Sequence, residues 1–294
     1  MSTVALSRGN NSRRSLSSLS TTSTSLSHAI SNIDSSKPAV VIEIGTKLTK
    51  CGFAGEFVPR AIIRTQFIDE SLNLNQDILK GNNGGSRPDI SVFFKFFKHI
   101  FYSHLLSMPR ERRVIIVENI LSPTNLRKTI CKVLLELLDV PSVMFVPSHL
   151  CCTFPFNTDY AVVVDVGYKE TLALPIAEGV TMLNSWEISN AGAQLVEERL
   201  RILLKDYGQV EGPGSQRRNL VETDWAKIEK NNTIEDISVR FIFCTSIERG
   251  RTIQEKGFDN KLDPISEAKL PLGSEFLIIP GYVRLSSKIE SGLA

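Results

Sequence analysis

Two short runs of the same kind constrain this chain more than any other feature of its sequence. Residues 39–45 are mostly apolar and β-branched and end in Glu43-Ile44-Gly45, and residues 160–166 lead into Asp165-Val166-Gly167. Each run predicts a buried strand that places a carboxylate and then a glycine at a turn. Glycine lets backbone amides approach an anion closely, and a carboxylate tolerates a nearby phosphate only across a divalent metal. The pair suggests two loops that grip a magnesium nucleotide, although a single loop of this kind is commonly only a turn.

Around these loops the hydrophobic spacing alternates between strands and helices, which predicts an α/β fold. The predicted strands span residues 39–45, 50–54, 113–118, 140–146, 160–166, 172–176 and 180–184, and the predicted helices span 92–106, 126–138 and 193–207. After Gly208 the pattern weakens: residues 212–215 predict a loop, and 234–247 begin as a helix. Residues 249–294 are polar, with short β-like pieces such as 276–279.

The N-terminal residues 1–36 have a composition of their own. Serine and threonine dominate them, Arg8, Arg13 and Arg14 add positive charge, and no acidic residue occurs before Asp34. Such a segment buries too little apolar surface to offset the entropy of ordering it, which predicts a disordered tail. The same composition also resembles a mitochondrial transit peptide, and this alternative stays open.

The overall composition is typical of a soluble globular protein, with 34 basic and 32 acidic residues and a net charge of +2. This balance favours no nucleic-acid partner, and no apolar run is long enough to span a bilayer. The five cysteines (Cys51, Cys131, Cys151, Cys152 and Cys244) have no zinc-like spacing, and an odd number cannot all pair. Packing in a reducing cytosol is the favoured interpretation, with redox chemistry of adjacent Cys151 and Cys152 as the alternative.

A specific family resemblance comes from the sequence that follows each loop. The first loop continues as Lys50-Cys51-Gly52-Phe53-Ala54-Gly55-Glu56 and then Pro59-Arg60, and the second continues through residues 168–179. Without a gap, these stretches resemble the two phosphate hairpins of the actin family, and 118–123 and 140–143 resemble segments between them. The resemblance implies an actin-like ATPase (ribonuclease H-like) α/β fold, with the first half complete and the second half incomplete.

The resemblance also implies a division of the chain into three parts. These are the Ser/Thr-rich tail of residues 1–36, a first actin-like subdomain over 37–155 with a shortened subdomain 2 insertion, and a partial second half over 156–294. A shortened insertion favours a subunit that docks on a filament end without offering a surface for the next protomer; simple trimming is the alternative. Because residues 285–294 depart from the family, we expect a truncated chain, from an alternative transcript or a mispredicted gene end. Such a chain leaves apolar surface uncovered, which favours poor folding or aggregation.

The same resemblance assigns roles to residues in the two loops. It implies that Lys50 reaches the phosphates, that Thr46 offers a hydroxyl to the terminal ones, and that Gly45 and Gly167 allow close backbone approach. Asp165 would hold the metal through its water shell. The implied cofactor is ATP or ADP with Mg²⁺, bound weakly or not at all by a truncated chain. The candidate cofactor-binding residues are therefore Glu43, Gly45, Thr46, Lys50, Asp165 and Gly167.

Several positions depart from the actin pattern. Glu43 stands where actin has Asp, which shifts the reach of that carboxylate. Lys47 replaces a glycine in the first loop, and Tyr168-Lys169 replace Asp-Gly in the second. These changes add bulk and charge to loops that must fit phosphates closely.

The position that carries the catalytic glutamine in actin is also changed. Ser148 stands where that glutamine orients the attacking water, and its loss is expected to slow hydrolysis greatly. The neighbouring His149 is the alternative base. We therefore predict no catalytic residues and a nucleotide-binding pseudo-ATPase.

Residues 50–56, 147–150, 165–170 and 235–237 resemble one branch of the actin-related proteins, the branch at the pointed end of the short actin-like filament in dynactin. That resemblance implies a cytoplasmic, cytoskeletal subunit beside the actin-related filament and the dynactin subunits p62, p25 and p27, linked indirectly to dynein and cargo. The alternatives are an active actin-like ATPase and a nuclear actin-related protein.

Overall fold

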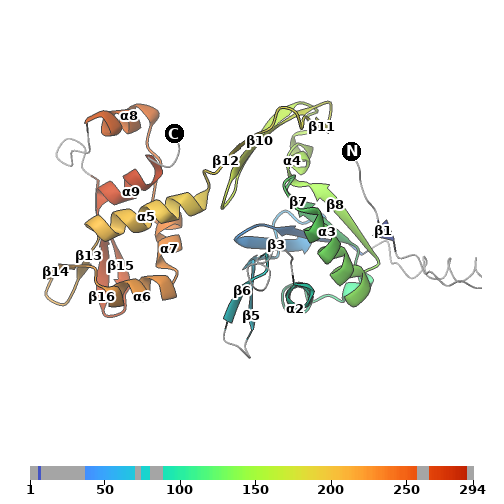
Figure 1. Ribbon diagram of the computed structural model, residues 1–294, viewed down its shortest axis with the longest axis horizontal. Helices are drawn as coiled ribbons and strands as arrows, with labels where there is room; N and C mark the ends of the chain where they lie inside the picture. Colours follow the sequence, from blue (N-terminus) through green and yellow to red (C-terminus); the bar gives the residue numbers. More distant parts are fainter. Residues whose placement is uncertain (1–5, 8–36, 70–73, 80–88, 257–264, 290–294) are drawn as a thin grey trace, which may run out of the picture. The chain divides into compact units, whose positions relative to one another are not determined.

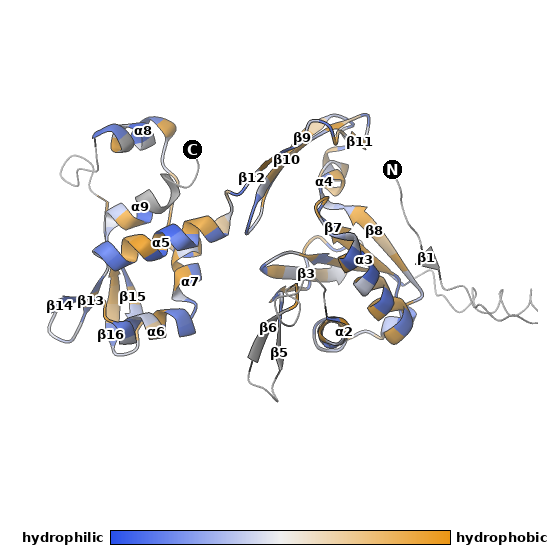
Figure 2. Ribbon diagram, in the orientation of Figure 1, coloured by the Kyte–Doolittle hydropathy of each residue, from blue (hydrophilic) through white to orange (hydrophobic). Residues whose placement is uncertain are grey.

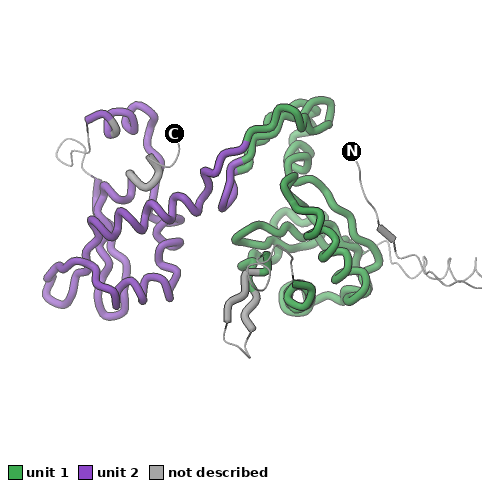
Figure 3. The backbone as a smooth tube through the Cα atoms, viewed as in Figure 1, with its two compact units in different colours: residues 1–165, 172–187 green, residues 166–171, 188–294 purple. Residues whose placement is uncertain are grey.

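The computed structural model describes residues 6–7, 37–69, 74–79, 89–256 and 265–289. Its residues form two compact units, shown in different colours in Figure 3. Unit 1 holds residues 1–165 and 172–187, and unit 2 holds 166–171 and 188–294. Most of the predicted N-terminal tail lies outside the described residues.

A six-stranded mixed sheet organises unit 1 (Figure 1). Its order is β1 (Leu6–Ser7), β8 (Ser142–Pro147), β7 (Val114–Glu118), β2 (Val40–Ile44), β3 (Leu48–Phe53) and β4 (Ala61–Arg64). Strands β8, β7 and β2 are parallel, whereas β3 and β4 extend the sheet as antiparallel neighbours of β2. The predicted strands 39–45, 113–118 and 140–146 and the hairpin return at 50–54 are confirmed.

Two long helical segments pack against this sheet and bury the core of unit 1. Helix α2 (Ile90–His99) begins at Asp89, whose carboxylate accepts a 2.8 Å hydrogen bond from the Ser91 amide, a normal N-cap. Helix α3 (Thr124–Cys131) follows β7. Figure 2 shows the resulting contrast between hydrophobic strands such as β8 and the mixed surface of α3. The fully buried residues of α2 and the turn after it are mainly Phe93, Phe96, Phe97, Ile100 and Phe101.

Both helices differ from the prediction in the same way. Each continues as a π-helix, η2 (Ile100–His104) after α2 and η4 (Lys132–Leu137) after α3. The predicted helices over 92–106 and 126–138 are confirmed as far as His104 and Leu137, and buried residues such as Phe97 and Leu134 belong to the core. The difference lies in the hydrogen bonds, which run from i to i+5 in these segments. Such π-helices are rare, and the hydrophobic pattern of the sequence does not distinguish them from α-helices.

The remaining helices and strands of unit 1 are short. They are helix α4 (Ser148–Cys151), the turns η3 (Pro109–Glu111) and η5 (Phe154–Phe156), and the hairpin of β5 (Gln66–Asp69) and β6 (Leu74–Asp77).

A smaller sheet follows β8 along the chain. Strand β10 (Thr171–Ala177) lies between β11 (Val180–Thr181) and β12 (Glu187–Ser189), and also pairs with β9 (Ala161–Val166). The predicted meander is confirmed, with a third strand of only two residues.

Unit 2 is built on a four-stranded antiparallel sheet in the order β14 (Arg217–Asn219), β13 (Gln209–Glu211), β16 (Glu275–Ile279) and β15 (Ala268–Leu272). Helix α5 (Ala193–Tyr207) has the bounds that the sequence predicts and buries Leu200, Leu203 and Leu204. The other helices are α6 (Glu222–Lys230), α7 (Thr233–Arg240), α8 (Ile247–Lys256) and α9 (Gly281–Ile289).

The prediction was weakest in this unit. The helix expected at the start of 234–247 is confirmed as α7, which ends at Arg240, and the strand expected at 276–279 is present in β16. The prediction of an irregular, partly β-like end over 249–294 is wrong for α8 and α9. Helix α8 is mainly polar, so it has too few apolar residues for a periodic pattern to predict a helix.

Candidate functional site

The first predicted loop is the tight turn between β2 and β3. Glu43 pairs with Lys50 and Ile44 with Thr49 across the strands, and the Gly45 amide closes the turn on the Leu48 carbonyl at 3.0 Å. A Cβ atom at Gly45 would lie 2.7 Å from that carbonyl oxygen, which is too close for any side chain. The turn therefore requires glycine at this position for a steric reason, and the predicted approach of its backbone to an anion stays a prediction.

Thr65, which the sequence analysis missed, anchors this loop through two hydrogen bonds. Its hydroxyl donates to the Gly45 carbonyl at 2.8 Å, and its amide donates to the Lys47 carbonyl at 3.0 Å. The Thr49 hydroxyl lies 2.9 Å from the Thr65 hydroxyl, and both side chains are fully buried. A chain of hydroxyl groups thus fixes the loop to the sheet. No sequence signal marks Thr65, because a threonine beside a strand is ordinary.

Two predicted cofactor residues are joined to each other in unit 1. The Lys50 ammonium lies 3.1 and 3.2 Å from the two carboxylate oxygens of Glu43. Both side chains are about half exposed, so the pair adds little to stability. Its chemical effect is larger: a phosphate group that uses Lys50 must share or displace Glu43.

The second predicted loop has the same local design. The Gly167 amide closes on the Glu170 carbonyl at 2.9 Å, and a Cβ atom at Gly167 would lie 3.0 Å from that oxygen. The carbonyls of Gly167 and Tyr168 accept hydrogen bonds from the Ala193 and Gln194 amides, at 3.1 and 2.8 Å, where helix α5 begins. The loop is therefore anchored to the first turn of α5.

Tyr168, which replaces an acidic residue of the actin pattern, packs within unit 2. Its hydroxyl donates to a Glu197 carboxylate oxygen at 3.1 Å. Burial and the Glu197 charge raise the pKa of Tyr168 to about 12, so the phenol stays protonated at neutral pH. This residue supports the loop and supplies no negative charge for a metal.

Helix α4 carries Ser148 and His149. His149 is buried, with its Nδ1 atom 3.2 Å from the Ser148 hydroxyl, and its Nε2 atom has no hydrogen-bond partner among the described residues. Burial lowers the pKa of His149, although the Asp165 charge and the Leu172 backbone oppose part of this shift. The imidazole is therefore neutral and shielded from solvent, which is unfavourable for a base that must meet water.

The electrostatics of α4 show which predicted residues lie near it in unit 1. The Asp165 charge acts on His149, and the Glu43 charge is among the smaller causes that raise the pKa of Cys151, after burial and Cys152. The two predicted carboxylates of this unit thus lie within electrostatic range of the same short helix. The raised pKa of Cys151 keeps its thiol protonated, which is the opposite of a reactive thiolate.

The remaining cysteine and metal predictions are simpler. All five cysteines are free; Cys51 is buried, whereas Cys152 and Cys244 are exposed. Packing therefore holds for Cys51 and not for Cys152. In the described part of the chain, no group of three or more His, Cys, Asp or Glu side chains is arranged to hold a metal directly.

The local geometry of the first loop fits a phosphate group. Gly45 adds no side chain, half-buried Thr46 follows it, and Lys50 supplies a positive charge on the strand after the turn. Glu43 and Asp165 are oxygen donors of the kind that hold hydrated Mg²⁺. The structure describes Gly167 in the other unit, where its turn has the same closed form.

Known proteins resemble this chain over most of its described length. A family model described as Actin matches residues 34–256. Actin-related protein 10 of Dictyostelium discoideum is 31% identical over 194 residues, which cover 58% of this chain and 40% of that protein. Actin-related protein 4 of Candida albicans is 22% identical over 215 residues, covering 67% and 46%, and Putative actin-29 of Dictyostelium discoideum is 25% identical over 199 residues, covering 60% and 51%.

The chain spans about half the length of these relatives or less. Among the helices that the structure describes, none combines the length and the apolar character needed to cross a membrane.

Proposed function

Because this chain belongs to the actin family, we propose that it is a structural actin-related subunit and not a polymerising actin. Its place would be the pointed end of the actin-like filament of dynactin, beside p62, p25 and p27. There it would support dynein-driven transport along microtubules and the attachment of cargo. This role places it in the cytoplasm, on the cytoskeleton.

The observation that carries the proposal is the similarity to Actin-related protein 10 of Dictyostelium discoideum. At 31% identity it exceeds the similarity to the actin-related protein 4 and to the putative actin described above, at 22% and 25%. The segments that resembled the pointed-end branch, such as residues 50–56 and 165–170, support the same conclusion.

A second observation supports a capping role. Between β4 and α2, the described residues form only the short hairpin of β5 and β6. A small insertion here fits a subunit that joins a filament end without gripping a further protomer. The domain division proposed from the sequence, with a shortened insertion in the first subdomain over 37–155, is consistent with this role.

We also propose that the two loops hold ATP or ADP with Mg²⁺, and hold it weakly. Gly45, Gly167 and Thr46 would face the phosphates, Lys50 would neutralise part of their charge, and Glu43 and Asp165 would hold the hydrated metal. When bound, the magnesium nucleotide would supply negative phosphates and a divalent cation for these groups. Lys50 is already paired with Glu43 at 3.1 Å, so a phosphate group would share this ammonium with a carboxylate.

Hydrolysis is not part of the proposed function. Ser148 has too short a side chain to take the place of a glutamine that orients water, and buried His149 is neutral and out of contact with solvent. Phosphate release from ATP, measured beside a Lys50→Ala, Asp165→Ala variant, tests this part. Turnover by the wild-type chain that clearly exceeds the variant would establish an active ATPase and refute the pseudo-enzyme.

The subunit role is tested by sedimentation. Tagged chain expressed in cells is expected to migrate with dynactin when the extract is separated on a sucrose gradient. Soluble chain that stays at the top of the gradient, or a tag that concentrates in the nucleus, would contradict the dynactin role. Concentration of the tag in the nucleus would favour the alternative of a nuclear actin-related protein.

A further inference from the structure

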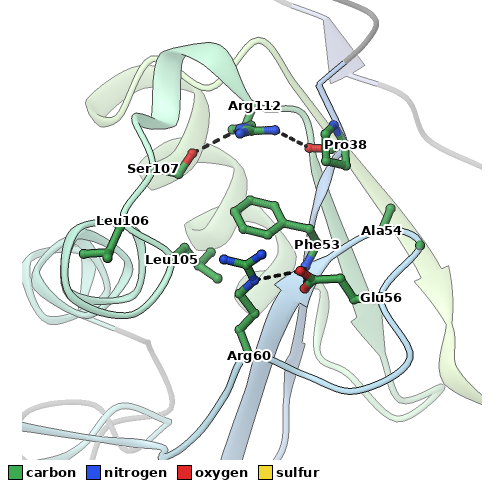
Figure 4. Close-up of a pocket in the computed structure, with 10 residues that line it drawn as sticks. Pro38, Phe53, Ala54, Glu56, Arg60, Leu105, Leu106, Ser107 and Arg112 are labelled. Carbon is green, nitrogen blue, oxygen red and sulfur yellow. Dashed lines mark hydrogen bonds and ion pairs between the residues drawn. The ribbon is translucent and has the colours of Figure 1, made fainter.

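A pocket of about 470 Å³ lies in unit 1, at the end of β3 that is remote from Gly45 (Figure 4). Its walls come from the turn after β3, from the chain just before β2, and from the segment that follows the π-helix η2. Phe53 ends β3, and the turn after it contains Ala54-Gly55-Glu56 and Arg60, which belong to the stretch that resembled the first phosphate hairpin of actins. The nucleotide loops make no use of these residues.

Two guanidinium groups flank a single aromatic ring in this pocket. The Cζ atom of Arg60 lies 4.8 Å and that of Arg112 lies 4.9 Å from the centre of the Phe53 ring, and Figure 4 shows them above and below it. Both distances are those of cation–π contacts. The Phe53 ring therefore contacts two positively charged groups.

Of these two charges, only that of Arg60 has a counter-ion among the described residues. Arg60 donates from Nε to a Glu56 carboxylate oxygen at 2.7 Å, and the other Glu56 oxygen accepts from the Phe53 amide at 3.0 Å. This backbone hydrogen bond, together with Arg60, lowers the pKa of Glu56 and keeps it ionised. The Arg60–Glu56 pair is therefore neutral overall and well fixed.

Arg112 is held by neutral acceptors alone. It donates from Nε to the Ser107 hydroxyl and from Nη1 to the Pro38 carbonyl, both at 3.1 Å, and no described carboxylate forms an ion pair with it. A guanidinium carries five N–H donors, so three remain for another group. A half-buried positive charge without a counter-ion favours the binding of an anion, and the two hydrogen bonds set the direction of the Arg112 guanidinium.

The rim of the pocket is apolar. Leu106 has a left-handed backbone with φ of 47°, and its side chain is 81% exposed, whereas the adjacent Leu105 is buried. A leucine with positive φ is strained, and the described residues leave most of the Leu106 side chain uncovered. This arrangement offers an apolar contact beside the unpaired charge of Arg112.

We propose that this pocket docks a short acidic segment of a protein partner. A carboxylate of the segment accepts hydrogen bonds from Arg112, and a neighbouring apolar side chain packs against Leu106 and the Phe53 ring. One unpaired cation beside apolar surface suits a peptide better than a nucleic acid, which is held by a row of basic residues along its backbone. The chain as a whole carries a net charge of only +2, which agrees with this choice.

A defined peptide tests the site on the full chain. The probe is an end-blocked, fluorescein-labelled heptapeptide that alternates Asp or Glu with Leu, and its control replaces the acids by Asn and Gln. Fluorescence anisotropy is expected to show saturable binding of the acidic peptide and about tenfold weaker binding of the amide peptide, because a hydrogen-bonded charge is lost. Equal binding of the two peptides would overturn the proposal, as would no saturable binding of the acidic one.

Neighbouring arginines provide a matched pair of variants. Arg112→Gln is expected to weaken binding about tenfold, whereas Arg113→Gln, which removes the same charge from an exposed side chain that does not line the pocket, is expected to change it less than about twofold. Equal losses in the two variants would show general attraction to a positive surface and would refute the site.

Because Arg112 also contacts Ser107 and Pro38, a second variant separates binding from folding. Leu106→Gly removes the apolar rim and relieves the positive φ, so the thermal midpoint is expected to hold or rise while peptide binding weakens. Unchanged peptide affinity in a folded Leu106→Gly chain would contradict the role of the rim.

Discussion

Replacing Thr65 by valine is expected to destabilise unit 1 and loosen the first loop. Valine keeps the shape of threonine, so no cavity forms, but the Gly45 carbonyl and the Thr49 hydroxyl each lose a partner. A hydrogen bond contributes about 1 kcal/mol, and a buried group left without a partner costs about 1–3 kcal/mol. We expect Thr65→Val to lower the free energy of unfolding by about 2 kcal/mol, since water reaches half-buried Gly45 and not Thr49.

Urea denaturation measures this loss, and hydrogen exchange over residues 40–53 measures the loosening of the loop. Thr49→Val alone is expected to cost about 1 kcal/mol, and the double variant less than the sum, because two apolar groups need no hydrogen bond. Exposed Thr124 at the start of α3 provides the control, where valine is expected to change stability by less than about 0.5 kcal/mol. Additive effects of the two substitutions, or a Thr65→Val chain as stable as the control, would refute the hydroxyl clamp.

Three further results follow from charges in the structure. Glu43→Gln is expected to raise the affinity for ATP in EDTA, because Lys50 is released, and to raise it less or not at all with Mg²⁺. Binding of a fluorescent ATP analogue measures both affinities. Equal gains in the two conditions would show that Glu43 only competes for Lys50 and does not hold the metal. Asp224, fully buried and hydrogen-bonded by Arg218 at 2.5 and 3.1 Å, has a lowered pKa, so its stabilisation is present above about pH 4 and is lost as pH falls through that lowered value. Asp224→Asn is therefore expected to cost about 2 kcal/mol at pH 7 and less at pH 3 in urea denaturation, and a cost that does not change with pH would contradict the ion pair. Burial lowers the pKa of His149, so stability is expected to fall as pH drops below about 6.5. In His149→Leu, the thermal midpoint is expected to depend less on pH between about pH 7 and 5. An unchanged pH dependence would contradict a buried neutral imidazole.

The predictable parts of the fold are those with a strict local requirement. The β2–β3 turn was readable because its geometry excludes every residue except glycine at Gly45. Helix α5 was readable to the residue because its apolar positions recur regularly and its flanking Gly192 and Gly208 mark both ends. Membership of the actin family and the actin-like α/β fold are confirmed by the match to residues 34–256.

The parts that could not be predicted depend on contacts distant in sequence. Helix α6 owes its N-terminus to buried Asp224, whose carboxylate accepts from the Val221 amide at 3.1 Å and pairs with Arg218 on β14. The local hydrophobic pattern does not predict such a network of hydrogen bonds and ion pairs.

The candidate site shows the same division between local and distant causes. The glycines and Lys50 followed from motif spacing, whereas the clamp by Thr65 joins residues 20 positions apart and the Glu43–Lys50 ion pair depends on strand register. The sequence pointed to His149 as an alternative base, and only the fold shows that its imidazole is buried. Functional roles for the six predicted cofactor residues remain predictions that nucleotide binding will test.

Affinity purification of the tagged chain from cell extract, followed by quantitative mass spectrometry, tests the central claim most directly. The proposed role predicts enrichment of p62, p25, p27 and the subunits of the actin-like filament over a tag-only control. A soluble chain, folded by circular dichroism, that retrieves none of these proteins would contradict the assignment to dynactin.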